Sequence, residues 1–174
     1  MSEIQNSDLN VLECFDPLDL KRDFFNRYSR PPRSLDEMKN ARYLILGHCT
    51  SSRFLEEIKR IGLVPDYRKE RGINDGLQSD SDCIYLLVGL DKYFLNRAIL
   101  HHGGEGLVIC VKVELGLLEA DENTIIPSYH KHLPSEEQLY VSLCGNQCKH
   151  KGPIKAEQIL GIYLEEGTKI WPLI

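Results

Sequence analysis

The sequence predicts a single domain of the α+β class, and three observations lead to that prediction. The chain has 174 residues, the usual length of one domain, and its 42% of hydrophobic residues is enough for one contiguous core. Short apolar runs with branched and aromatic side chains, such as residues 43–46, are typical of buried strands. Residues 52–61 place apolar side chains at helical spacing, which is typical of a helix packed on a sheet.

The first forty residues differ from the remainder of the chain in composition and in the pattern of their apolar residues. We expect residues 1–40 to form an N-terminal appendage, partly helical, and residues 41–174 to form the domain. Ser34 and Glu37 have the spacing of a capping box, which predicts a short helix to about residue 40.

Strands and short helices alternate from residue 41 onward. Gly62 is expected to end the helix over 52–61, and two glycines after residue 102 to end a helix over 91–102. Residues 64–82 form a polar connection that is longer than usual, and such loops are often functional lids. The expected strands cover residues 43–46, 83–88, 107–113, 139–143, 149–154 and 159–164.

Composition excludes several classes of function. The net charge of −5 argues against a broad electrostatic grip on nucleic acid. The polar N-terminal residues and the lack of a long apolar run predict a cytoplasmic protein with no membrane partner, unless it is a delivered toxin or effector. The cysteine and histidine spacing around Cys144, Cys148 and His150 is irregular, so no metal site is predicted.

A polar turn follows the first predicted strand and precedes the first amphipathic helix. The turn reads His48-Cys49-Thr50-Ser51. The helix after it reads Leu-Glu-Glu-Ile-Lys-Arg-Ile-Gly-Leu over residues 55–63. The next strand contains Tyr85 between an isoleucine and a leucine, and a later segment, 152–159, reads Gly-Pro-Ile-Lys-Ala-Glu-Gln-Ile.

In this order, residues 43–164 resemble the small ADP-ribosyltransferases of the histidine–tyrosine type, as in diphtheria toxin and the poly(ADP-ribose) polymerases. Members of that family carry a His-Gly-Thr-Ser turn, a helix ending in Gly-Leu, and a strand reading Val-Tyr-Leu. The resemblance implies a split, two-sheet β-sandwich with a few short helices, and a cleft that holds the nicotinamide end of NAD, which is the substrate.

The resemblance also assigns roles to the residues that match. His48 would hydrogen-bond a ribose hydroxyl, a bond that a neutral imidazole can make. The backbone of Cys49, in place of the family's glycine, would pair with the carboxamide, and Tyr85 would offer a flat face to the nicotinamide. Thr50 and Ser51 would supply hydroxyls near the diphosphate or the turn.

The third catalytic position of the family is usually a glutamate, and two residues compete for it here. Glu137 stands at the start of an expected strand and is preferred. Gln147 stands just before the next expected strand, and its amide could hydrogen-bond the ribose but could not act as a carboxylate.

The function expected from the resemblance is that of an enzyme, an NAD-dependent mono-ADP-ribosyltransferase. It would cleave the nicotinamide–ribose bond and pass ADP-ribose to an unknown acceptor, whether a protein, a nucleic acid or a small molecule. One alternative is a catalytically inactive NAD- or nucleotide-binding module of the same fold. A second alternative is an enzyme like the RNA 2′-phosphotransferases, whose chemistry needs several basic residues around the phosphate.

Overall fold

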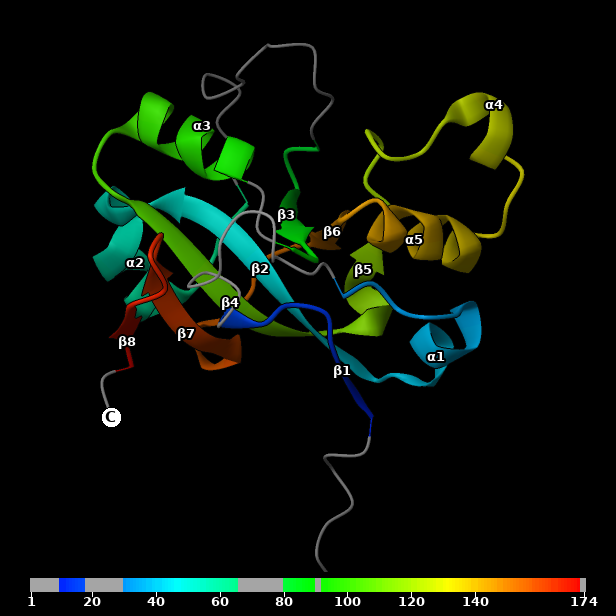
Figure 1. Ribbon diagram of the computed structural model, residues 1–174, viewed down its shortest axis with the longest axis horizontal. Coiled ribbons are helices and arrows are strands. Elements are labelled where there is room, and N and C mark those ends of the chain that lie inside the picture. The colour runs from blue at the N-terminus through cyan, green and yellow to red at the C-terminus, as the bar shows by residue number, and fades with distance from the viewer. Residues whose placement is uncertain (1–9, 18–29, 66–79, 90–91, 173–174) are drawn as a thin grey trace, which may run out of the picture.

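The computed structural model describes residues 10–17, 30–65, 80–89 and 92–172. Within these residues the fold is α+β, as predicted: a mostly antiparallel sheet of 8 strands carries a few short helices (Figure 1). The strands are β1 (Val11–Glu13), β2 (Tyr43–Ser51), β3 (Cys83–Leu87), β4 (Gly106–Glu114), β5 (Leu118–Glu119), β6 (Gln147–Lys151), β7 (Ile159–Leu164) and β8 (Lys169–Trp171).

The helices are short and lie between the strands along the chain. The α-helices are α1 (Leu35–Asn40), α2 (Leu55–Ile61), α3 (Lys92–His102), α4 (Pro127–His130) and α5 (Ser135–Cys144). The single turns of 3₁₀ helix are η3 (Ser52–Phe54), η5 (Leu115–Leu117) and η6 (Ala156–Gln158).

The strands follow one hydrogen-bonded path in the order β5-β6-β3-β2-β4-β7-β8, and β1 pairs with β2 in parallel. The ladder between β2 and β4 is long and runs over the whole of both strands. The ladder between β2 and β3 is a single pair, Gly47 with Leu87. The sheet is therefore continuous, but only this narrow junction joins its β5-β6-β3 half to its β2-β4-β7-β8 half.

Apolar side chains cover both faces of the sheet. On one face the larger core cluster joins the inward side of β2 and β4 to Met38 of α1, Ile58 of α2 and Leu143 of α5. On the other face a smaller cluster joins Leu95 of α3 to β4 and Phe15. Because β4 is central and buried on both faces, its near-continuous apolar run is what the sequence led us to expect.

The N-terminal segment contributes to this same core. In the predicted helix α1, the Ser34 side chain accepts a hydrogen bond from the Glu37 amide at 3.1 Å, which confirms the expected cap. Residues 11–13 add β1 to the edge of β2. The segment thus adds one strand and one helix to the domain.

One predicted strand is wrong. Residues 139–143 lie in the helix α5, where Leu139, Ser142 and Leu143 are buried on one face. The run reads as a strand because it contains a tyrosine and a valine. The i, i+4 spacing of the two leucines prevails because it gives α5 an apolar stripe to place on the core.

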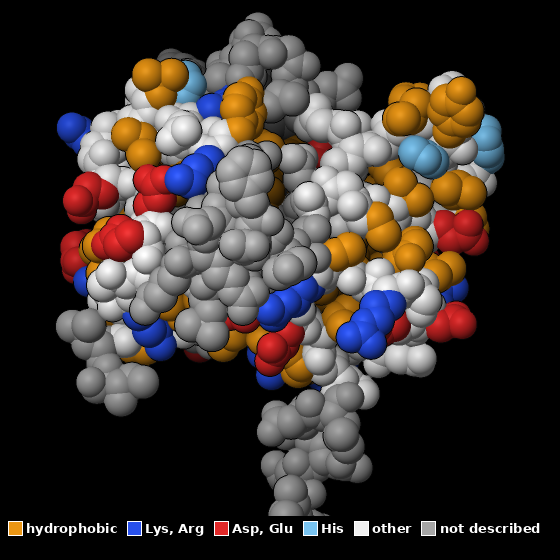
Figure 2. Space-filling view, in the orientation of Figure 1, with side chains coloured by type: hydrophobic (Ala, Val, Ile, Leu, Met, Phe, Trp, Pro, Cys, Tyr) orange, Lys and Arg blue, Asp and Glu red, His pale blue; other side chains and the backbone are white. Residues whose placement is uncertain are grey.

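The charged side chains form no single-sign patch on the face drawn in Figure 2, where basic and acidic groups are interspersed. Hydrophobic side chains gather over α4 and α5 on that face (Figure 2), and Ile126 and Tyr129 are among those exposed. Among the described residues no helix has the length and apolar character needed to cross a membrane.

Candidate functional site

The candidate site lies where β2 and β3 separate. The edge of β2 pairs with β1 over residues 43–45 and with β3 only at Gly47. The residue after Gly47 is His48, and its side chain reaches across to β3. The predicted histidine therefore lies directly beside the point where β2 and β3 stop pairing.

His48 is oriented by the backbone of Tyr85. The Nδ1 atom of His48 lies 2.9 Å from the carbonyl oxygen of Tyr85, which can only accept, so Nδ1 carries the proton. Burial lowers the pKa of His48 despite this hydrogen bond, so the ring is neutral near pH 7 and Nε2 is an acceptor. Within the described part of the chain, Nε2 has no hydrogen-bond partner.

A cleft of about 420 Å³ opens beside this histidine, a size within the range of small-molecule sites. Four of the five predicted cofactor-binding residues line it: His48, Cys49, Thr50 and Tyr85. The remaining lining is largely apolar and comes from η3, α2, the chain after α2, β3 and α3: Phe54, Ile58, Ile61, Gly62, Leu63, Val64, Pro65, Cys83, Ile84 and Ala98. The expected lid, residues 64–82, lies mostly outside the described residues.

The glycine that ends α2 shapes one wall of this cleft. Gly62 has φ 85° and ψ −159°, a conformation that essentially only glycine adopts. A Cβ atom there would lie 2.0 Å from the carbonyl oxygen of Ile154. Leu63 and Ile154 exchange two backbone hydrogen bonds, so the Gly-Leu step and the 152–159 segment of the resemblance meet here.

The fifth predicted binding residue, Ser51, does not line the cleft. It is buried, its hydroxyl donates to the carbonyl oxygen of Gly103 at 2.5 Å, and it accepts from the Arg53 amide at 3.2 Å. Ser51 therefore ties the end of β2 to the end of α3.

The structure separates the two candidates for the third catalytic position. Glu137 does not begin a strand. It lies in the first turn of α5, on the side of Lys39, whose pKa is raised by a hydrogen bond to Glu136 and also by the charge of Glu137. The prediction of a strand at Glu137 is thus wrong, and Glu137 does not line the cleft.

Gln147 is the first residue of β6, the strand next to β3. It pairs with Leu87, which pairs in turn with Gly47, so the three residues form one row across the junction. With a strand spacing of about 4.8 Å, this row places Gln147 roughly 10 Å from the backbone at His48. Gln147 is not among the described residues that line the cleft.

Sequence reasoning missed three groups near the site. Glu57, in the first turn of α2, and His102, at the end of α3, both line the cleft. Glu122 accepts a hydrogen bond from the Tyr85 hydroxyl at 2.5 Å. The pattern of α2 marked Glu57 only as an acidic residue favourable at a helix start, and no local motif marks Glu122.

Comparisons with known proteins assign no family to the chain. No family model matches it, and no curated protein matches it significantly. The chemistry of the cleft therefore has to be inferred from the described residues that line it. They supply the neutral His48 imidazole, a second imidazole at His102, the Thr50 hydroxyl, the Tyr85 ring, the Glu57 carboxylate and a largely apolar wall.

Proposed function

We propose that the cleft binds NAD and that the protein is a mono-ADP-ribosyltransferase. The observation that carries the proposal is the convergence of His48, Cys49, Thr50 and Tyr85 on one cleft, with His48 held by the Tyr85 backbone. These residues come from two strands and match the two signatures that the resemblance joins. The reaction would cleave the nicotinamide–ribose bond and pass ADP-ribose to an acceptor.

The geometry supports a role for each group. The Nε2 atom of His48 would accept a hydrogen bond from a ribose hydroxyl, because Nδ1 already donates to Tyr85. The Tyr85 ring would pack against the nicotinamide, and the Thr50 hydroxyl would bind nearby. The apolar walls would exclude water from the ribosyl carbon and so limit hydrolysis.

The sheet also supports the finer fold proposal. A split sandwich of the ADP-ribosyltransferase type needs two half-sheets that diverge beside the histidine strand. The junction of β2 and β3 consists of one residue pair, next to His48. The two halves on either side of this pair are candidates for the two sheets of that fold.

For the third catalytic position we now prefer Gln147. Gln147 lies on the strand next to that of Tyr85 and in the row of Gly47, whereas Glu137 lies on a helix beside α1. An amide can hydrogen-bond a ribose hydroxyl but gives less charge stabilisation to an oxocarbenium-like transition state than a carboxylate. Slow turnover is therefore expected.

One observation favours the alternative of a binding module without catalysis. Of the described residues that line the cleft, Glu57 alone is a carboxylate, and it is exposed on α2. The alternative of an RNA 2′-phosphotransferase has less support, because the described lining contains no lysine or arginine to bind a phosphate.

Calorimetric titration with NAD tests the proposal. Loss of one hydrogen bond in His48→Ala is expected to weaken NAD binding about tenfold, and the exposed His132 provides the control variant His132→Ala, which should bind as the wild type does. Failure of the wild-type protein to bind millimolar NAD rejects the proposal.

Turnover is measured separately, as nicotinamide release and as transfer of labelled ADP-ribose to proteins of a cell lysate. Gln147→Ala is expected to lower turnover more than NAD affinity, the pattern of an interaction made mainly in the transition state. NAD binding with no nicotinamide release would establish the alternative of a binding module.

A further inference from the structure

Tyr85 is held at both of its ends by polar contacts. Its carbonyl oxygen accepts from His48, and its hydroxyl donates to Oε1 of Glu122 at 2.5 Å. The same hydroxyl accepts from the amide of Asp80 at 2.6 Å. A phenol that both donates and accepts has its oxygen fixed in space, so the ring between the two ends has a defined place at the cleft.

The Glu122 carboxylate is itself held by Lys149, a half-buried lysine. Oε2 of Glu122 lies 3.1 Å from Nζ of Lys149, and these side chains are only 24% and 13% exposed. Lys149 pairs with Tyr85 across the β3–β6 ladder, so both side chains lie on the same face of the sheet. Burial alone would lower the pKa of Lys149, but the contact and charge of Glu122, together with the charges of Cys83 and Asp80, outweigh burial and raise that pKa.

Two further carboxylates, Asp80 and Glu119, lie 3.5 Å and 4.0 Å from the Lys149 ammonium. They differ from Glu122 in their relation to the phenol. Asp80 meets the phenol only through its backbone, and Glu119 shows no contact with it among the described residues. Glu119 is thus a natural control, because it shares the lysine but not the tyrosine.

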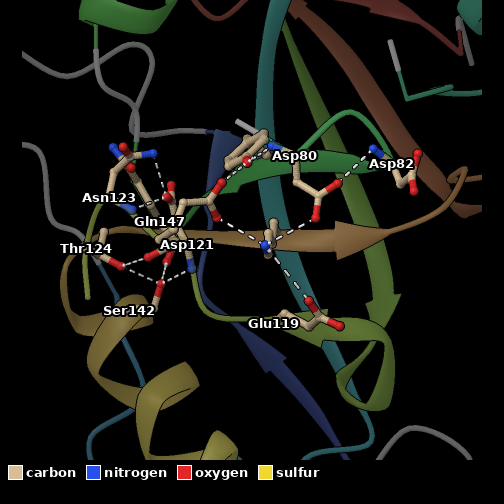
Figure 3. A network of polar contacts seen from close by, with 11 residues as sticks. Asp80, Asp82, Glu119, Asp121, Asn123, Thr124, Ser142 and Gln147 are labelled. Atoms are coloured by element: carbon tan, nitrogen blue, oxygen red, sulfur yellow. Dashed lines mark hydrogen bonds and ion pairs between the residues drawn. The ribbon is translucent and has the colours of Figure 1, made fainter. Parts of the chain in front are cut away.

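The turn that carries Glu122 is anchored before and after it (Figure 3). Asp121 is buried, its amide donates to the Ser142 hydroxyl at 2.8 Å, and its carboxylate accepts from the backbone and side chain of Asn123. The Ser142 hydroxyl donates in turn to the carbonyl oxygen of Gln147 at 2.6 Å. These bonds tie the turn to α5 and to the start of β6, so Glu122 has a fixed position relative to β3.

We propose that Glu122 is a positioning residue of the cleft: through the Tyr85 hydroxyl it fixes the aromatic ring against which the ligand packs, and Lys149 holds the Glu122 carboxylate in place. The proposal rests on the proposed function in one respect, since the ligand is taken to be NAD. A charge-assisted hydrogen bond is stronger than a neutral one, so the ring is held more firmly than by packing alone. The sequence shows none of this, because Tyr85 and Glu122 are 37 residues apart.

The first test compares NAD affinity in three variants by calorimetric titration. Glu122→Gln keeps the shape and removes the charge, and Tyr85→Phe keeps the ring and removes the hydroxyl. Each is expected to weaken NAD binding about three- to tenfold, because the ring is no longer fixed. Glu119→Gln should change the affinity less than twofold, within the scatter usual for an exposed ion pair.

The double variant separates positioning from a general structural role. If Glu122 acts through the phenol, Glu122→Gln adds no further loss of affinity once Tyr85→Phe is present. A merely structural role would give additive losses. If Glu122→Gln fails to fold, Tyr85→Phe alone decides: unchanged affinity in a folded Tyr85→Phe protein overturns the proposal.

A measurement without ligand distinguishes failure of this proposal from failure of NAD binding. Burial and the Glu122 hydrogen bond raise the pKa of the Tyr85 phenol. The ¹³Cζ chemical shift of Tyr85 at neutral pH reports on the hydrogen bond that the phenol donates, so in labelled protein it should change in Glu122→Gln and stay at the wild-type value in Glu119→Gln. An unchanged shift in Glu122→Gln would overturn the positioning role whether or not NAD binds, whereas a changed shift in a protein that does not bind NAD would reject the proposed function alone.

Discussion

Substitution of Gly62 by alanine tests the link between the end of α2 and the wall of the cleft. The backbone at Gly62, with φ 85° and ψ −159°, costs a residue with a side chain about 1–3 kcal/mol. The new Cβ would also lie 2.0 Å from the Ile154 carbonyl oxygen and 2.7 Å from the Ala156 amide nitrogen, both of them backbone atoms. These atoms can move away only by disturbing the Leu63–Ile154 pair.

That pair consists of two hydrogen bonds, of 2.8 Å and 2.9 Å, each contributing about 0.5–1.5 kcal/mol. Strain and lost hydrogen bonds together predict that Gly62→Ala lowers the free energy of unfolding by about 2–6 kcal/mol. Urea unfolding followed by circular dichroism measures the change. Gly116→Ala is the control, because no atom lies within 4 Å of its added Cβ, and it should stay within about 1 kcal/mol of the wild type. A loss below about 1 kcal/mol for Gly62→Ala would refute the reasoning.

Three further predictions concern the residues around His48. NAD should slow the alkylation of Cys49, which lines the cleft, and should leave the alkylation of the exposed Cys144 unchanged. Mass spectrometry of the modified peptides measures both rates. Equal rates for Cys49 with and without NAD would contradict the assignment of the cleft. Ser51→Ala should lower the free energy of unfolding by about 1–3 kcal/mol, because the half-buried carbonyl of Gly103 loses its hydroxyl donor. Thr50→Val should instead weaken NAD binding about threefold, with a smaller change in urea unfolding. The reverse pattern would exchange the two roles. Burial lowers the pKa of His48 in the folded protein, so as the pH falls the unfolded chain takes up a proton on this histidine first. The neutral, buried His48 therefore stabilises the fold above its ordinary pKa of about 6.5, and this stabilisation is lost as the pH falls below that value. His48→Gln, which cannot take up the proton, should lose less stability than the wild type in urea unfolding between about pH 7 and 5.

Local patterns predicted much of the fold. The cap at Ser34, the glycine end of α2 and the apolar run of β4 depend on neighbours in the sequence, and the structure confirms each of them. The run at residues 139–143 misled because a few apolar residues fit a strand as well as a buried helix turn. The segment forms a helix because a helix packs Leu139 and Leu143 onto the core beside β5 and β6.

The candidate site was predictable only in part. The histidine turn and the tyrosine strand carry recognisable motifs, and both line the cleft. The third position had no motif, and the sequence favoured Glu137 over Gln147 only because Glu137 was expected to begin a strand, which is wrong. The strand order separates them, because Gln147 lies on β6, the strand beside that of Tyr85, while a helix removes Glu137 from the sheet.

The sequence by itself determined which residues form strands and helices over most of the domain, and it identified His48 and Tyr85 as a candidate pair. Only the tertiary structure showed the single-pair junction of β2 and β3, the cleft beside it, and the contacts of Tyr85 with Glu122 and of Glu122 with Lys149. The physical reason is the distance along the sequence over which each kind of interaction acts. Capping and periodicity act between residues a few positions apart, whereas the Glu122 carboxylate meets the Tyr85 phenol and Lys149 only after the sheet has brought distant segments together.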